Sequence, residues 1–351
     1  PGGVSLTGGW PEVWRANLCL RGAVRVLARI GEFLAFHPAQ LDKRARKFPW
    51  EQVLRPDVPV VVEATSHASQ IWHAGAARDR IARAIAEELG AVVIAAGGGA
   101  EDAAGSEAPV RVLARLDDNR VTLSVDTSGE PLHKRGAKVA TGKAPMRETM
   151  AAMLLRAAGL DGREPVVDPM CGSGTFIIEA AEIAAGFAPG RSRGFAFERL
   201  ATFDPGRWAA LRTGLAGAAA TAEGPPRCFG FDRDEGAIRG AEANAGRAGV
   251  APLCRFARQP VSDLCPPEGL PPGLVIANPP YGTRIGERKP LFALYGAFGQ
   301  VLLDRFAGWR AAIVTTDEGL ARATGLPFLP PGPPVLHGGL KVRLWQTGPL
   351  P

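Results

Sequence analysis

The sequence lacks the features of several specialised protein classes. No stretch reaches the roughly 18 consecutive apolar residues of a membrane span, so we expect no membrane partner. No charged segment followed by an apolar core opens the chain, so we expect no secretory signal. The five cysteines form no CxxC pair, which argues against a zinc site and favours reduced thiols in the cytoplasm. No Ser-His-Asp arrangement and no HExxH motif is visible among the scattered histidines.

The composition is that of a folded chain with a basic balance. Apolar residues make up 46% and charged residues 22% of the 351 residues, which excludes a disordered chain and favours two or three domains. Lys and Arg number 41 against 35 acidic residues, which gives a net charge of +6. Only seven of these 41 are lysine, and arginine suits phosphate because its planar fork donates two parallel hydrogen bonds. Compositional drift explains the arginine excess equally well, so charge alone does not indicate nucleic acid.

The first 130 residues predict a small α+β region. Apolar residues at helical spacing predict a helix over Ala74–Leu89, and Gly90 is placed to end it. Two alternating runs around Asp117–Asn119 predict a β-hairpin. Because the first elements are too few to close a core, we expect that an N-terminal piece is missing. The other elements expected here are strands at Val4–Leu6, Val24–Phe36 and Val58–Val62, a helix at Pro11–Leu20 and a loop at Gly97–Ala108.

Strands and helices alternate from Glu148 onward. Repeated strand–helix units predict a parallel sheet with helices on both faces, which is the α/β fold class. We expect strands at 166–168, 228–231, 254–257, 274–277, 311–315 and 341–345, and helices at 148–158, 175–185, 207–221, 234–248 and 291–306.

A basic linker joins these two regions. Residues 133–147 hold five Lys or Arg and no acid. A run this basic can follow a phosphate backbone, although a solvated connector is the alternative. The predicted RNA contacts in the linker are Lys134, Arg135, Lys138 and Lys143.

The segment Asp168–Thr175 follows an apolar strand and opens a helix. Its glycines allow a ligand to approach the backbone, and ligands of open α/β sheets bind at the carboxyl ends of strands. A dinucleotide site would have a third glycine where Ile177 stands, and the acid before the glycines would repel a pyrophosphate. The acid suits a cation, which favours S-adenosylmethionine (SAM) over a plain tight turn. The predicted SAM contacts here are Asp168, Met170, Cys171, Gly172, Ser173, Gly174 and Thr175.

Two later acids are further candidates for this cofactor. Asp232 ends the next predicted strand and can accept hydrogen bonds from ribose hydroxyls, with Arg233 directly after it. Asp263 follows the third strand and can accept from an adenine amino group, although an ordinary loop aspartate fits nearly as well.

The segment Asn278–Tyr281 directly follows the apolar strand Leu274–Ala277. Pro279 and Pro280 stiffen the backbone and keep the residue before them extended. This rigidity would hold the Asn278 side-chain oxygen and the Pro279 carbonyl as fixed acceptors for one exocyclic amine. Tyr281 offers a ring on which a flat base can stack. The segment therefore predicts methyl transfer to an amine by orientation, and Asn278 is also a predicted SAM contact.

These motifs together are similar to those of a known family. DPMCGSGTFIIEAA at 168–181 and NPPYGTRIGE at 278–287 resemble class I SAM-dependent RNA methyltransferases that carry a THUMP domain. The likeness is greatest to bacterial enzymes that methylate guanine N2 in large-subunit ribosomal RNA. VDTSGEPLHKRG at 125–136, APMRETMAA at 144–152 and APGRSRGF at 188–195 extend the resemblance, which is weaker over 40–120.

The resemblance implies both an organisation and a function. It implies a partial ferredoxin-like segment at 1–38, a THUMP-like RNA-binding domain at 39–130, a linker at 131–147 and a Rossmann-like methyltransferase domain at 148–351. The expected cofactor is SAM, without metal, and the expected substrate is guanosine N2 in 23S ribosomal RNA. The alternatives are a tRNA guanine-N2 enzyme, an N6-adenine methyltransferase and a catalytically silent RNA-binding platform.

Overall fold

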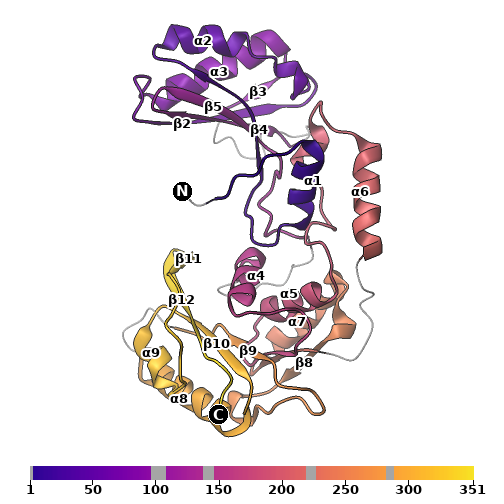
Figure 1. Ribbon diagram of the computed structural model, residues 1–351, viewed down its shortest axis with the longest axis vertical. Coiled ribbons are helices and arrows are strands. Elements are labelled where there is room, and N and C mark those ends of the chain that lie inside the picture. The colour runs from indigo at the N-terminus through magenta and orange to yellow at the C-terminus, as the bar shows by residue number, and fades with distance from the viewer. Residues whose placement is uncertain (1–2, 96–107, 137–145, 219–226, 282–287) are drawn as a thin grey trace. The chain divides into compact units, whose positions relative to one another are not determined.

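The computed structural model describes residues 3–95, 108–136, 146–218, 227–281 and 288–351. The chain divides into two compact units (Figure 1). Unit 1 consists of residues 1–132 and 193–214, and unit 2 consists of residues 133–192 and 215–351. The chain therefore passes between the units three times.

Unit 1 is built on a five-stranded sheet in the order β1-β5-β4-β2-β3. β2 is parallel to β3 and β4, whereas β5 is antiparallel to β1 and β4. Alternate side chains of β4 are buried, as expected where one face of a strand lies in the core. The strands are β1 (Leu27–Leu34), β2 (Val60–His67), β3 (Val93–Ile94), β4 (Val110–Asp117) and β5 (Arg120–Asp126).

Two helices, α2 (Pro38–Arg46) and α3 (Ala74–Leu89), lie on one face of this sheet (Figure 1). α3 is the helix predicted from apolar spacing, and Gly90 ends it with a φ of 74°. The predicted hairpin is also confirmed. Asp118 and Asn119 connect β4 to β5 with φ values of 49° and 62°, the left-handed conformation that a tight hairpin turn requires.

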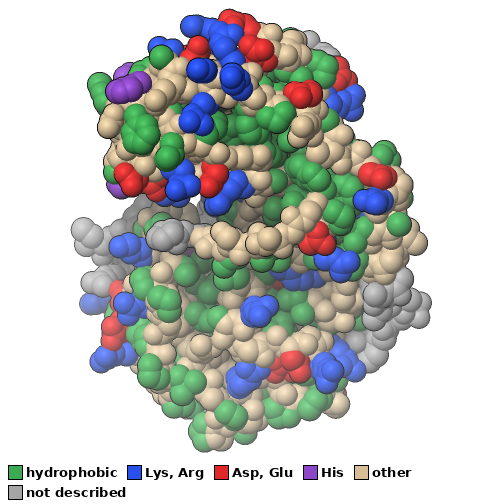
Figure 2. Space-filling view, turned by 45° about the horizontal axis from the view of Figure 1, so that its top comes forward, with side chains coloured by type: hydrophobic (Ala, Val, Ile, Leu, Met, Phe, Trp, Pro, Cys, Tyr) green, Lys and Arg blue, Asp and Glu red, His purple; other side chains and the backbone are tan. Residues whose placement is uncertain are grey.

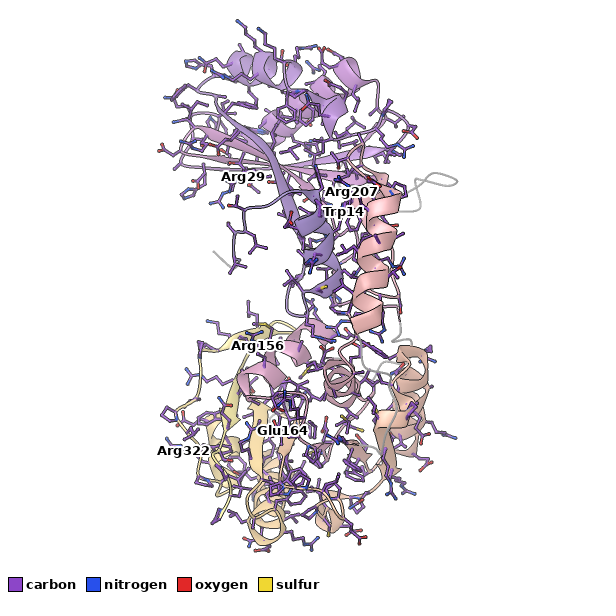
Figure 3. The ribbon with its side chains drawn as sticks, turned by 45° about the vertical axis from the view of Figure 1, so that its right-hand side comes forward. Trp14, Arg29, Arg156, Glu164, Arg207 and Arg322 are labelled. Carbon is purple, nitrogen blue, oxygen red and sulfur yellow. The ribbon has the colours of Figure 1, made fainter. Side chains whose placement is uncertain are left out.

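Residues 193–214, which we expected within the methyltransferase domain, pack in unit 1. They include most of α6 (Pro205–Ala218) and lie against α1 (Trp10–Cys19). The ring of Trp14, labelled in Figure 3, stacks on Phe197 at a centroid distance of 6.0 Å. Arg193 also donates to the Glu130 carbonyl at 2.8 Å. Burial of aromatic rings and satisfaction of loop carbonyls explain why this segment joins unit 1.

Unit 2 has a seven-stranded sheet in the order β11-β12-β10-β9-β6-β7-β8. The run from β10 to β8 is parallel, as the alternation of strands and helices predicted, and β12 is antiparallel to β10. The strands are β6 (Val166–Asp168), β7 (Cys228–Asp232), β8 (Cys254–Arg258), β9 (Leu274–Ala277), β10 (Arg310–Thr315), β11 (Val335–His337) and β12 (Leu340–Gln346).

Helices cover both faces of this sheet, which makes unit 2 a three-layer α/β structure. One core contains buried side chains of α4 (Glu148–Ala157), α5 (Thr175–Ala184) and α7 (Glu235–Ala248). The other core contains side chains of α8 (Arg288–Arg305) and α9 (Glu318–Ala323). The mixed α/β class with a Rossmann-like unit is therefore confirmed.

Some predicted elements differ from the structure. Residues Val4–Leu6 form no strand, and Val4 is 90% exposed, because none of the strands in the described ranges pairs with this segment. The strand expected over Val24–Phe36 is shorter, as β1 shows. The short elements α2, α9, β3 and β11 were not predicted, since so few residues carry no periodic signal. None of the helices in the described ranges is both long and apolar enough to cross a bilayer.

Candidate active site

Three neighbouring parallel strands of unit 2 end at the same edge of its sheet. β9, β6 and β7 lie side by side, and the predicted residues Asn278, Asp168 and Asp232 stand at or just beyond their carboxyl ends. β6 comes first in the chain and has a neighbour on either side, so the connections diverge there. Open α/β sheets form their ligand crevice at such a switch point. The fold therefore brings these three residues to one edge.

The loop after β6 depends on glycine. Gly172 has a φ of 52° and Gly174 a φ of 79°, both in the left-handed region. A Cβ added to Gly174 would lie 3.0 Å from the Cβ of Ala241 and 3.2 Å from the ring of Phe256. Gly172 instead faces open space, so a ligand can reach its backbone. The glycines thus serve the two uses that the sequence indicated, a tight turn and a close approach.

Asp168 is buried at the base of this loop with 2% of its surface exposed. Its Oδ1 accepts a hydrogen bond from the Met170 amide at 3.0 Å. Burial raises the pKa of Asp168 to about 8, and the charge of Asp232 adds to this rise, while the Met170 amide opposes it. No Lys or Arg in the described ranges forms a salt bridge with Asp168. No cation of the described residues therefore neutralises this carboxyl.

Asp232 holds the same loop from the neighbouring strand. Its Oδ2 accepts from the Gly172 amide at 3.0 Å, and its Oδ1 accepts from the Asp234 amide at 3.0 Å. The sequence pointed only to the ribose role, whereas the structure adds a loop-binding role. Arg233 follows with an exposed side chain, and its carbonyl accepts from Nε of Arg258 at 3.1 Å.

Two contacts to this loop were missed by sequence reasoning. Asn244 of α7, 1% exposed, donates from Nδ2 to the Ser173 carbonyl at 3.1 Å. Its signal was a polar amide within an alanine-rich helix, where asparagine is disfavoured unless its side chain bonds elsewhere. Cys171 packs beside Gly230 of β7, where an added Cβ would lie 3.1 Å from the Cys171 Sγ. Burial raises the pKa of the Cys171 thiol, so it acts in packing.

The segment after β9 presents one unpaired acceptor. Oδ1 of Asn278 is buried and accepts no hydrogen bond from the described residues. Pro279 is buried and Pro280 is exposed. Tyr281 is half-buried, packs against both cores of unit 2, and has its pKa raised by burial. The arrangement therefore offers a fixed carbonyl acceptor next to an aromatic ring.

Asp263 lies farther out on the surface. It ends a single helical turn, Val261–Asp263, and its carboxylate accepts from the Ser262 hydroxyl at 2.9 Å. Its exposure leaves the carboxylate accessible, and the adenine contact stays a prediction.

The predicted RNA contacts of the linker differ in their burial. Arg135 is 7% exposed and forms ion pairs with Glu179 and Glu182 of α5, the latter at 3.0 Å. A guanidinium buried between two carboxylates is not presented to a phosphate, so the structure gives Arg135 a structural role in place of the expected RNA contact. Lys134 is exposed, and Lys138 and Lys143 lie outside the described residues.

No three His, Cys, Asp or Glu side chains of the described residues come together as a metal site. The chemistry available at this edge is hydrogen bonding by Asn278, two carboxylates near an open glycine loop, and the ring of Tyr281.

Comparisons with known proteins agree with this geometry. The profile of a family described as "RMKL-like, methyltransferase domain" matches residues 135–326, and that of the "RlmL ferredoxin-like domain" matches residues 1–27. A Vibrio campbellii protein named "Ribosomal RNA large subunit methyltransferase K/L" is 40% identical over 214 residues, which cover 60% of this chain and 30% of that protein. A Synechocystis protein named "Putative RNA methyltransferase" is 32% identical, covering 97% of this chain and 87% of that protein. The chain thus spans under a third of the Vibrio relative's length.

Solved structures show the same fold over nearly the whole chain. One, from Listeria monocytogenes and described as a predicted N6-adenine-specific DNA methylase, has a TM-score of 0.82 at 31% identity, covering 97% of this chain and 87% of that one. Another, described as a putative methyltransferase complexed with SAH, has a TM-score of 0.83 at 27% identity, covering 98% and 89%.

Unit 2, with its glycine loop after the first strand and Asn-Pro-Pro-Tyr after the fourth, has the fold of a class I methyltransferase. The chain belongs to the family of the RMKL-like methyltransferase domain.

Proposed function

We propose that this protein is a SAM-dependent RNA methyltransferase that acts on the exocyclic N2 of a guanosine in large-subunit (23S) ribosomal RNA. The observation that carries the proposal is the buried Oδ1 of Asn278, which has no partner among the described residues. A buried acceptor left unpaired costs free energy, and an exocyclic amine would supply the missing donor. The position of Asn278 at the end of β9 would bring that amine next to the glycine loop.

The residues at this edge fit SAM. Asp168 would face the ammonium group, because a nearby cation favours the ionised form of a buried carboxyl. Asp232 would accept from the ribose hydroxyls while it holds Gly172, and Asp263 would accept from the adenine amine. Gly172 leaves room for the ligand at the loop backbone. SAM supplies an activated methyl group when it is bound.

The chemistry at the amine is one of orientation. Oδ1 of Asn278 and the Pro279 carbonyl each accept a hydrogen bond from one amine N–H, which directs the nitrogen lone pair toward the methyl carbon. As the nitrogen–carbon bond forms and the carbon–sulfur bond breaks, the nitrogen gains positive charge that both acceptors stabilise. The sulfur keeps the electron pair of the broken bond, and the nitrogen then loses a proton to solvent. Tyr281 stacks on the base, which must leave its helix to reach this edge.

The proposed substrate is supported by the comparisons and by the motif resemblance, and not by the geometry of the site. The relative named for large-subunit ribosomal RNA supports RNA, and the motif resemblance supports guanine N2. The description of the Listeria structure favours adenine N6 in DNA as the second candidate, since Asn-Pro-Pro-Tyr fits either amine. A tRNA guanosine is the remaining nucleic-acid alternative. A silent binding platform fits poorly, because Asp168, Asp232 and Asn278 are all in place.

The expected domains belong to the same proposal. Residues 1–38 would form a partial ferredoxin-like segment, 39–130 a THUMP-like RNA-binding domain, 131–147 a linker and 148–351 the methyltransferase domain. The family profile at residues 1–27 supports the first of these. Lys134, Lys138 and Lys143 would contact RNA, and an RNA substrate of the ribosome places the protein in the cytoplasm.

The test is product analysis. The full chain is incubated with SAM and, separately, with a large-subunit ribosomal RNA transcript, bulk tRNA and duplex DNA, followed by mass spectrometry of the nucleosides. We expect N2-methylguanosine in the ribosomal transcript, formed far more slowly by Asn278→Ala. N6-methyladenine in DNA, or methylation of tRNA alone, would contradict the proposed substrate.

A further inference from the structure

The acidic residues on the helical face of unit 1 are already engaged. Arg46 of α2 pairs with Asp42 at 3.3 Å and with Glu88 of α3 at 3.1 Å, and it also pairs with Glu87. Arg78 likewise pairs with Asp79 at 2.8 Å. These ion pairs neutralise the carboxylates of α2 and α3, because each carboxylate lies beside a guanidinium.

Five cations on the same helices are left over. They form no salt bridge with the acidic residues that the structure describes, and we call them the basic rim. The members of the basic rim are Lys43, Arg44 and Lys47 at the end of α2 and Arg80 and Arg83 on α3.

The spacing of the basic rim brings its members to one region. Arg80 and Arg83 are three residues apart on α3, and Arg83 lies four residues before Glu87, so all three share one side of that helix. Glu87 contacts Arg46, so this side of α3 faces α2. Lys43 lies three residues before Arg46, and Lys47 follows as the helical C-cap. Figure 2 shows Lys and Arg side chains gathered over the helical end of this unit, with acidic ones among them.

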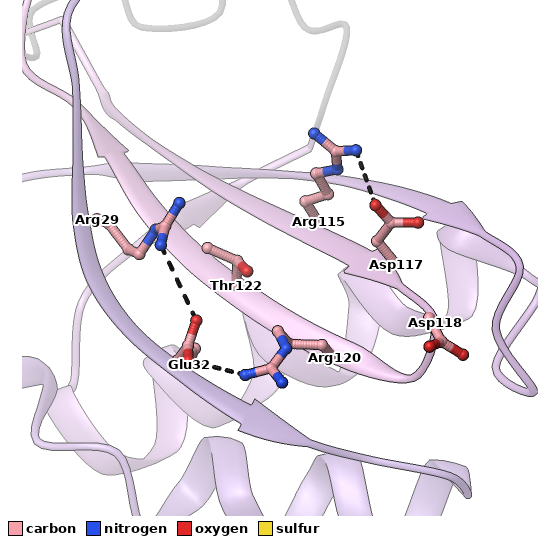
Figure 4. A pocket seen from close by; sticks show the side chains of 7 residues that line it. All are labelled: Arg29, Glu32, Arg115, Asp117, Asp118, Arg120 and Thr122. Atoms are coloured by element: carbon pink, nitrogen blue, oxygen red, sulfur yellow. Dashed lines mark hydrogen bonds and ion pairs between the residues drawn. The ribbon is translucent and has the colours of Figure 1, made fainter. Parts of the chain in front are cut away.

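On the face of the unit 1 sheet that α2 and α3 leave uncovered, the arginines are paired with acids, unlike the basic rim. Its shallow cavity of about 410 Å³ is polar, but acids line it together with the arginines (Figure 4). Arg115 pairs with Asp117 at 2.8 Å, and Arg120 pairs with Glu32 at 2.9 Å. A phosphate entering this cavity would have to displace a carboxylate and then lie beside it. The sheet face therefore suits a polyanion poorly, since like charges repel.

We propose that the basic rim, and not the sheet face, binds the phosphate backbone of the RNA substrate. The inference rests on the proposed function, because it takes RNA as the partner. Unpaired cations gain most from a polyanion, since they release its counterions without first breaking an internal pair. Lys43 and Lys47 lie about 6 Å apart along the helix axis, which suits neighbouring phosphates of one strand.

The test compares pairs of neutral substitutions in the full chain. The rim variants are Lys43→Gln/Lys47→Gln and Arg80→Gln/Arg83→Gln, since glutamine keeps good helix propensity. The matched control is Arg115→Gln/Arg120→Gln, which removes the same two charges from the sheet face. Fluorescence anisotropy with a labelled large-subunit RNA transcript gives the affinity of each variant at several salt concentrations. Circular dichroism melting verifies that each variant is folded.

We expect each rim variant to bind RNA more weakly and to lose roughly 0.7–0.9 of the salt-dependence slope for each contact removed. The control should keep the wild-type slope. The proposed role of the basic rim is wrong if the wild-type protein methylates RNA and the rim variants bind RNA as tightly as the wild type does. That result would leave the proposed function intact. Wild-type protein that neither binds nor methylates RNA would overturn both. Loss of binding to phosphatidylserine vesicles with unchanged RNA binding would assign the rim to a membrane surface and overturn the proposal.

Discussion

Oδ2 of Asp232 accepts a hydrogen bond from the backbone amide of Gly172 at 3.0 Å. The acid at the end of β7 thereby fixes the glycine loop that follows β6, a strand earlier in the chain. A carboxylate that binds a loop amide through one oxygen still has lone pairs for a ligand hydroxyl. Asp232 can therefore shape the cofactor loop and contact the cofactor at the same time.

This double role predicts a binding defect. Asp232→Ala should weaken SAM binding by about 1.5–3 kcal/mol, the range for a hydrogen bond to a charged group. Asp234→Ala is the matched control, because Asp234 caps α7 by accepting from the Gly236 and Ala237 amides and should cost about 1 kcal/mol of stability alone. Titration calorimetry gives both SAM affinities. Equal affinities for the two variants would remove Asp232 from the site.

Asp168 predicts that SAM binding releases a proton. With burial raising its pKa to about 8, the Asp168 carboxyl is protonated at pH 6.5 in the free protein. The ammonium of SAM favours the carboxylate, so binding at that pH should release close to one proton, seen as a difference in calorimetric enthalpy between phosphate and imidazole buffers. Asp168→Asn should abolish this difference. Buffer-independent enthalpies for the wild type would contradict the assignment.

The raised pKa of Asp168 also determines how the stability of the protein changes with pH. The unfolded carboxyl has a pKa of about 3.9, so between this value and about 8 the folded state binds more protons. In the absence of SAM, the contribution of Asp168 to the free energy of unfolding should then fall as the pH rises through this window.

Gly230 predicts a steric effect on the loop. Gly230 pairs with Asp168 in the sheet, and an added Cβ would lie 2.6 Å from the Phe256 ring. Gly230→Ala should destabilise the protein by roughly 1–3 kcal/mol through overpacking and weaken SAM binding through Cys171. Gly246→Ala on α7 meets no atom within 4 Å and should stabilise by roughly 0.5–1 kcal/mol. Calorimetric melting that ranks the two variants the other way would refute the packing argument.

The network around Arg135 predicts a stability effect in place of an RNA effect. Arg135→Ala would leave Glu179 buried without this partner, which should cost about 3–5 kcal/mol of folding stability. Arg135→Met with Glu179→Gln should recover part of the loss, because it removes the buried charge. Lys341→Gln is the control at an exposed lysine of β12 and should leave the melting temperature unchanged. Denaturant unfolding measures all three, and a neutral Arg135→Ala would show that the network contributes nothing.

The sequence predicts much of the fold because its signals are local. Periodic apolar residues mark α3 and α7, and the left-handed residues Asp118 and Asn119 mark the hairpin. The glycine loop and Asn278 could be placed together because parallel strands end at one edge. The individual SAM and RNA contacts stay predictions.

Other features could not be predicted because they depend on distant partners. Nothing in the basic run around Arg135 shows that it meets Glu179, 44 residues later. The packing of Phe197 on Trp14 likewise joins segments far apart in the chain. Charge within a short window therefore indicates RNA binding poorly, since the fold decides which cations are already paired.

Asn278 and Tyr281 separate catalysis from binding. Because the buried Oδ1 of Asn278 has no partner in the described part of the chain, Asn278→Ala should cost little stability. Its acceptor matters most as the amine gains charge, so the loss should appear in turnover, on the order of 100-fold or more. RNA affinity should barely change, since phosphate contacts elsewhere supply most of it. Single-turnover methyl transfer at saturating SAM and RNA measures the rate.

Tyr281 should behave differently from Asn278. Tyr281→Ala removes the ring and should lose about 1–3 kcal/mol of stacking on the base. Tyr281→Phe keeps the ring and should retain most of the rate. Burial raises the pKa of Tyr281, so its hydroxyl stays protonated near neutral pH and takes no proton from the amine. A dead Tyr281→Phe, or a near-normal rate for Asn278→Ala, would mean that the acceptor and the stacking surface at this edge lie elsewhere.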